Sequence, residues 1–147
     1  MIRMTKQTDY GILALTHFAN AGDGAVLTAR DVARETSIAR PMVSKILKLL
    51  AKSGLLLSLR GIKGGYRLAK RAHEISVAEI ITVLEGPLAM TECSTGTPGQ
   101  CKVEHHCPVS RHWQLINHAV RAALQDMTLT SMTGPAPQQL INIGGRL

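Results

Sequence analysis

The feature that most constrains the fold is a change of hydrophobic pattern at Gly54. Upstream of it, apolar residues recur at helical spacing over residues 29–36 and again over residues 40–53. Downstream, residues 55–60 and 66–68 have the composition of short strands, and the glycine-rich segment between them predicts a turn. The middle of the chain is therefore predicted to form two short helices followed by a β-hairpin.

The same segment carries most of the positive charge. Between Thr28 and Arg71 there are 11 lysines and arginines against two acids, a net charge of +9, whereas the rest of the chain sums to −2. Such a segment is typical of a polyanion-binding surface, although a solvated surface without a partner can have the same composition. Two helices and a basic hairpin are the element order of a winged helix-turn-helix, whose second helix enters the DNA major groove.

On this reading the hairpin is a wing that lies along the phosphates, and we expect Gly64 and Gly65 to let its backbone approach the duplex. The expected contacts divide by type. Base edges are assigned to Arg40, Ser44 and Lys45, and phosphates or the minor groove to Lys48, Arg60, Lys63 and Arg67.

A long amphipathic helix is predicted from Pro108 to Asp126. A domain of this size has little core left for such a helix, so we expect it to pair with the same helix of a second subunit in a homodimer. The alternative is that the helix packs on its own domain. Its apolar side consists of Trp113, Ile116, Val120, Ala123, Leu124 and Met127.

Composition completes the fold class. Aromatic residues make up only 3% of the chain, which favours a mainly α fold with a small β-hairpin wing. Further helices are predicted over residues 4–20 and 77–84. No run approaches the roughly 20 apolar residues of a membrane span, and the N-terminus lacks a signal-peptide core, so we expect a cytoplasmic protein. The expected organisation is 1–85 DNA-binding winged helix-turn-helix domain, 86–107 cysteine-rich cluster-binding loop, 108–132 dimerisation helix and 133–147 flexible tail.

All three cysteines, Cys93, Cys101 and Cys107, lie in one short segment rich in Gly, Pro and Thr. Such a loop cannot build a core, so its thiols predict a metal or cluster site. Gaps of seven and five residues suit the paired ligands of structural zinc poorly and a wider loop around an iron–sulfur cluster better. Zinc and redox-active thiols remain alternatives on spacing alone.

Taken together, these segments resemble the iron–sulfur winged-helix transcription regulators of the IscR and NsrR type over residues 4–132. The stretches 84–93 and 116–124 resemble the branch that regulates the SUF iron–sulfur assembly operon. The other motifs that carry the resemblance are Thr5-Lys6-x-Thr8-Asp9-Tyr10, Val43-Ser44-Lys45-Ile46-Leu47, Arg60-Gly61-x-x-Gly64-Gly65-Tyr66-Arg67-Leu68, the three cysteines and Trp113.

The resemblance implies an iron–sulfur cluster on the three cysteines, of the 2Fe–2S type in IscR-like members or 4Fe–4S in NsrR-like ones, with 2Fe–2S favoured here. IscR-like members have a histidine as fourth ligand three residues after the last cysteine, where this chain has Ser110. NsrR-like members use an aspartate near the N-terminus of the partner subunit, and Asp9 stands at the matching position. His106 and His112 are further candidates.

The predicted function is a dimeric DNA-binding regulator that represses SUF-type iron–sulfur assembly genes and senses through a labile cluster. The alternatives are a zinc-stabilised winged-helix regulator without sensing, or a regulator of the same family that responds to nitric oxide or redox state. A thiol redox enzyme is disfavoured because the chain has no Cys-x-x-Cys motif, nucleotide-binding glycine loop or catalytic triad pattern.

Overall fold

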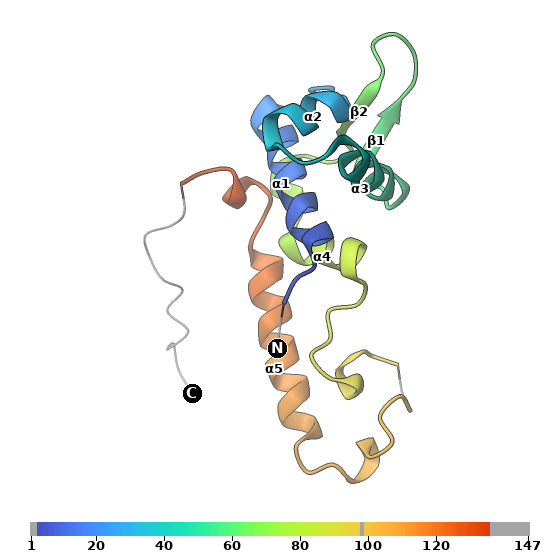
Figure 1. Cartoon of the computed structure of the whole chain (residues 1–147). Coiled ribbons are helices and arrows are strands. Elements are labelled where there is room, and N and C mark those ends of the chain that lie inside the picture. The colour runs from blue at the N-terminus through green and yellow to red at the C-terminus, as the bar shows by residue number, and fades with distance from the viewer. Residues whose placement is uncertain (1–2, 98, 136–147) are drawn as a thin grey trace.

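The fold is mainly helical with one two-stranded antiparallel hairpin, as the sequence predicted (Figure 1). The computed structural model describes residues 3–97 and 99–135. A compact head contains the first four helices and the hairpin, and the last helix extends away from it beside the cysteine loop. The elements are α1 (Lys6–Ala21), α2 (Ala29–Thr36), α3 (Arg40–Lys52), β1 (Leu56–Leu59), β2 (Gly65–Leu68), α4 (Val77–Glu85) and α5 (Ser110–Asp126).

Hydroxyl side chains set the starts of three helices. Thr28 caps α2 in a complete capping box with Asp31, as predicted, and Ser76 caps α4. Thr5 accepts a hydrogen bond from the Thr8 backbone, so α1 begins at Lys6 and not at residue 4. The last helix also begins two residues later than predicted, at Ser110.

The wing is joined to the body by a third backbone segment. Leu56 pairs with Leu68 and Leu59 with Gly65 across the hairpin. The segment before α2 then pairs with β2, because the Leu27 N–H donates to the Tyr66 carbonyl at 2.9 Å and the Tyr66 N–H donates to the Leu27 carbonyl at 2.8 Å. The base of the wing is thereby fixed, while its tip is exposed.

The two wing glycines have a reason within the protein that the sequence interpretation missed. A Cβ on Gly64 would lie 2.6 Å from the Leu59 carbonyl oxygen, and one on Gly65 would lie 2.7 Å from the Leu27 carbonyl oxygen. Gly65 also has a φ of 156°. Close approach to the chain's own backbone is therefore one reason for glycine at these positions, and close approach to DNA stays a prediction.

The core of the head is aliphatic around one aromatic ring, that of Phe18. Leu129, beyond the end of α5, is fully buried in this same core. Two backbone hydrogen bonds of 2.8 Å hold its segment, from the Val77 N–H to the Met127 carbonyl and from the Leu129 N–H to the Ile75 carbonyl. The C-terminal end of α5 is thus attached to the head at the start of α4.

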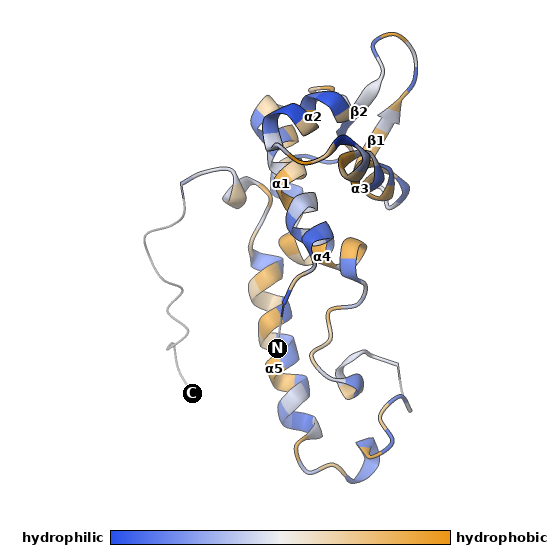
Figure 2. Cartoon of the chain, in the orientation of Figure 1, coloured by the Kyte–Doolittle hydropathy of each residue, from blue (hydrophilic) through white to orange (hydrophobic). Residues whose placement is uncertain are grey.

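The apolar side of α5 is largely uncovered. Ile116 and Val120 are 44% and 39% exposed, and apolar residues recur along the helix in Figure 2. No helix in residues 3–97 and 99–135 is both long and apolar enough to cross a membrane. Of the tail predicted to be flexible, residues 133–135 follow a short turn, and residues 136–147 lie outside the described residues.

Candidate functional site

The predicted DNA-contacting residues gather at one end of the head, on α3 and the adjoining wing (Figure 1). The six cations among them are exposed and Ser44 is half-buried. Within the described part of the chain, the ion pairs of this basic segment involve Arg34 and Lys70 and none of these six cations. The exposed cations are Arg40, Lys45, Lys48, Arg60, Lys63 and Arg67.

Two residues that the sequence interpretation did not select also belong to this surface. Arg30 and Arg40 line one cavity of about 340 Å³ at the start of α2. Ile62, at the tip of the wing, is fully exposed. The net charge of the segment could have indicated Arg30, whereas an apolar residue at a hairpin tip gives no signal before the turn is placed.

Asp31 lies in the same cavity, and its role there is structural. Hydrogen bonds from the side chain and backbone of Thr28 hold the pKa of Asp31 below its ordinary value. Its carboxylate therefore stays ionised as the partner of Thr28 in the cap of α2. The neighbouring Arg30 and Arg40 have no ion-pair partner among the described residues.

The cysteine loop connects α4 to α5. Cys93 lies in a short 3-10 helix (Glu92–Ser94) that packs against α5, with its Sγ 3.2 Å from the Thr91 hydroxyl. Cys101 lies in a turn, and Cys107 precedes α5. All three thiols are free and half-buried. The loop has no buried apolar side chain among its described residues, so its shape depends on local turns and on its attachment to α5.

One buried side chain makes that attachment. Asn117, in the middle of α5, is 7% exposed, and its Oδ1 accepts a hydrogen bond of 3.2 Å from the Met90 backbone N–H. The sequence interpretation missed Asn117 because a lone polar residue on a helix predicts no partner. The structure makes it the contact between the helix and the start of the loop.

The three thiols are chemically suited to an iron–sulfur cluster, but they are not arranged as a preformed binding site. Soft thiolates from one pliable loop are suitable ligands for iron. In residues 3–97 and 99–135, however, no three His, Cys, Asp or Glu side chains converge as metal ligands would. The chain thus brings the three cysteines into one loop without bringing their sulfur atoms to one point, and the loop would have to rearrange to hold a cluster.

The candidates for a fourth ligand differ in their position in the fold and in their exposure. Asp9 is exposed on α1, and His106 and His112 are exposed at the end of the loop and in the first turn of α5. Ser110 is 8% exposed at the start of α5, and its N–H donates to the Cys107 carbonyl at 3.3 Å. Asp9 is therefore the one of these positions that lies far from the cysteines in the sequence.

A hydrogen-bond network connects the turn of Asp9 to the start of the cysteine loop. The Thr8 hydroxyl donates to Glu85 at 2.6 Å and the Thr5 N–H donates to the same oxygen at 2.7 Å. These bonds, that of Thr8 above all, hold the pKa of Glu85 below its ordinary value. Because Glu85 ends α4, the network joins the N-terminal turn of α1 to the point where the loop begins.

Comparison with known proteins agrees with this arrangement. Among solved structures, CymR of B. subtilis, described as its global cysteine regulator, superposes with a TM-score of 0.71 at 23% identity, covering 90% of this chain and 97% of that one. IscR of T. potens superposes with a TM-score of 0.68 at 24% identity, covering 89% and 85%. CymR of Staphylococcus aureus gives 0.66 at 26% identity, covering 91% and 100%.

Below 25% identity such likeness shows the winged-helix fold alone. The family is shown by a sequence model, described as Rrf2, iron-dependent transcriptional regulator, which matches residues 4–135. The family and these structural neighbours are transcription regulators and not enzymes. With its exposed cationic α3 and wing, this chain belongs to the Rrf2 family of DNA-binding transcriptional regulators.

Proposed function

We propose that this chain is a homodimeric repressor of SUF-type iron–sulfur assembly genes that senses through an iron–sulfur cluster on Cys93, Cys101 and Cys107. The observation that carries the proposal is the position of all three thiols in the one loop that connects the DNA-binding head to α5. The family description as iron-dependent supports iron as the metal. The IscR-like and SUF-type features of the sequence support the branch.

The proposed ligands are the three thiolates, with Asp9 of a second subunit completing the set. Occupancy of such a site by a cluster would depend on the supply of iron and sulfide. A carboxylate holds iron less firmly than a thiolate does, so a set completed by Asp9 favours a labile site. Lability is what a sensor requires, and a 2Fe–2S cluster remains the favoured type.

The chain offers a route from the loop to the DNA-binding surface. Asn117 joins the start of the loop to α5, and the segment after α5 inserts Leu129 into the core of the head. A change in the fold of the loop would therefore bear on α5 and on the orientation of the two heads in a dimer. Operator affinity depends on that orientation because half-sites are spaced by the DNA helix.

The proposed dimer surface is the exposed apolar side of α5. Ile116 and Val120 on this side are 44% and 39% exposed, and a second subunit packed there would bury them. Rrf2 regulators are typically dimeric. The proposed division of the chain into head, loop, dimerisation helix and tail follows from this assignment.

The decisive experiment is an absorption spectrum and iron and sulfide analysis of anaerobically purified protein. Visible absorption bands that are lost in Cys101→Ser are expected, whereas a colourless protein with stoichiometric zinc would establish the zinc-stabilised alternative. Operator binding by loaded and cluster-free protein at fixed salt then tests sensing. Equal affinities of the two forms would refute it.

A redox-responsive regulator is the second candidate. The three thiols are free and half-buried and do not converge as metal ligands in the described residues. CymR of Staphylococcus aureus, 25% identical, has been solved in an oxidized form. If colourless, metal-free protein lost operator affinity on mild oxidation and regained it on reduction, this candidate would replace cluster sensing.

A further inference from the structure

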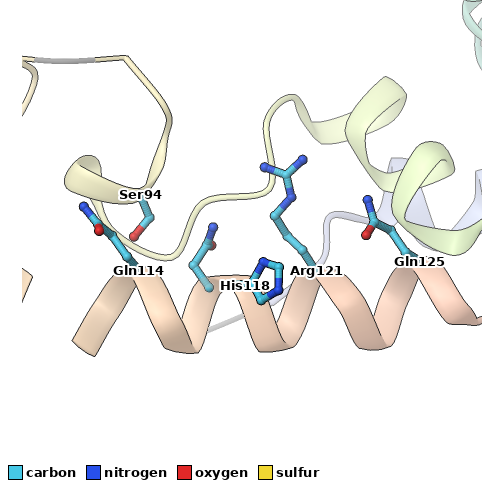
Figure 3. Close-up of a pocket in the computed structure, with 6 residues that line it drawn as sticks. Ser94, Gln114, His118, Arg121 and Gln125 are labelled. Atoms are coloured by element: carbon cyan, nitrogen blue, oxygen red, sulfur yellow. The ribbon is translucent and has the colours of Figure 1, made fainter. Parts of the chain in front are cut away.

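A polar groove runs along α5 on the flank that faces the cysteine loop. It has a volume of about 360 Å³ and is lined by Ser94, Gln114, Asn117, His118, Arg121 and Gln125. In Figure 3 the side chains of Arg121 and Gln125 extend from α5 toward the segments opposite, and Ser94 faces Gln114. Every lining side chain has a hydrogen-bonding group, and none is a carboxylate.

The positive charge of this groove is not neutralised by the neighbouring acid. Arg121 also borders a cavity that contains Glu79, but the Glu79 carboxylate is bound to Lys70 at 2.6 Å. Within residues 3–97 and 99–135, Arg121 has no ion-pair partner. A guanidinium with five donors beside amide and hydroxyl groups is suited to a carboxylate, which it can bind through two parallel hydrogen bonds.

The groove and the proposed dimer surface are neighbouring flanks of the helix, since Asn117 and Arg121 also line a cavity with Val120 and Leu124. Successive helical residues are about 100° apart, which puts His118 and Val120 on roughly opposite sides. The groove residues repeat at spacings of three and four, as do the apolar residues of the other flank. A second subunit packed on the apolar flank would thus leave the His118 side of the groove uncovered.

We propose that this groove is a binding site for a small organic anion with two or more carboxylates. Arg121 would bind one carboxylate, while His118, one turn earlier on the helix, and the side-chain amides of Gln114 and Gln125 would bind the remainder. The volume is in the usual range for small-molecule sites. Ser94 directly follows Cys93, and its hydroxyl lies 2.8 Å from that of Thr91, so an occupied groove contacts the turn that bears the first thiol.

The test is titration calorimetry of the full-length protein with citrate, malate and inorganic phosphate, each balanced with chloride to constant ionic strength. The fluorescence of Trp113, the one tryptophan of the chain, gives a second readout from the turn before Asn117. Saturable binding of citrate or malate is expected, with a Kd of about 1 mM or lower. Arg121→Gln should weaken it at least about tenfold, because the charged hydrogen bonds are lost.

The control is Arg111→Gln, which removes the same charge from the same helix about 15 Å away along its axis and outside the groove. It should bind the carboxylates as the unaltered protein does. No saturable binding, an equal loss in both variants, or phosphate binding as tightly as citrate would overturn the proposal. The titration does not depend on DNA or on cluster content, so it can fail while the proposed cluster sensing stands.

Discussion

Replacing Arg60 with alanine should reduce the salt dependence of operator binding by a definite amount. Arg60 is exposed just after β1, at the base of the wing turn, and has no ion pair in the described residues. Each phosphate contact contributes about 0.9 to the slope of log K against log salt. In the proposed dimer two contacts are lost, so the slope should become less steep by about 1.8.

This difference is large enough to measure directly. Between 50 and 200 mM salt the unaltered protein should lose about tenfold more affinity than Arg60→Ala does. Fluorescence anisotropy with a labelled operator, repeated at four or five salt concentrations, gives both slopes. The matched control is Lys102→Ala, which removes one charge from the cysteine loop, away from the wing. An unchanged slope for Arg60→Ala, or an equal change for Lys102→Ala, would exclude Arg60 from the DNA interface.

Three further predictions concern the head. Leu129→Ala should lower the free energy of unfolding by about 2–5 kcal/mol in urea denaturation, because the substitution leaves a cavity at a fully buried site. A loss below about 1 kcal/mol would show that Leu129 does not anchor α5. The hydrogen bonds to Glu85 lower its pKa, so they stabilise the fold fully above pH 4.5, the ordinary pKa, and this stabilisation is lost as the pH falls through the lower pKa of the folded state. Replacing Thr8 with valine removes the strongest of these bonds, so Thr8→Val should raise the pKa of Glu85 toward 4.5 in an NMR titration. A pKa unmoved by Thr8→Val would contradict the bond. Gly64→Ala should cost about 1–3 kcal/mol, since its Cβ would overlap the Leu59 carbonyl, and should weaken operator binding; unchanged stability and affinity would refute the steric argument.

Local signals explain why the head was predictable from the sequence. A threonine cap with an acid three residues later set the start of α2, and Gly54 set the end of α3 through its positive φ of 84°. These signals act within a few residues, so they are readable before the chain is folded. The wing glycines show the limit of such reasoning, because the carbonyl of Leu27 that crowds Gly65 comes from a segment almost 40 residues earlier.

The cysteine loop and its attachments lie beyond that limit. The sequence indicates that three thiols share a loop, since their proximity in the chain is enough, but the convergence of their sulfur atoms depends on turns that carry little burial. Asn117 contacts the start of the loop through one hydrogen bond to Met90, which lies 27 residues earlier in the chain. Glu85 ends the helix from which the loop starts, 8 residues before Cys93. Neither residue type predicts such a partner.

The weak internal packing of the loop is consistent with its proposed role. A loop of half-buried thiols, joined to α5 through the short helix of Cys93 and one Asn117 hydrogen bond, can change its fold at small cost, because few apolar contacts need to be broken. The attachment of α5 to the head is firmer, since Leu129 is fully buried and its segment is held by two backbone hydrogen bonds. A pliable loop at one end of a helix and a rigid anchor at the other favour transmission of a change in the loop to the DNA-binding head rather than its loss within the helix.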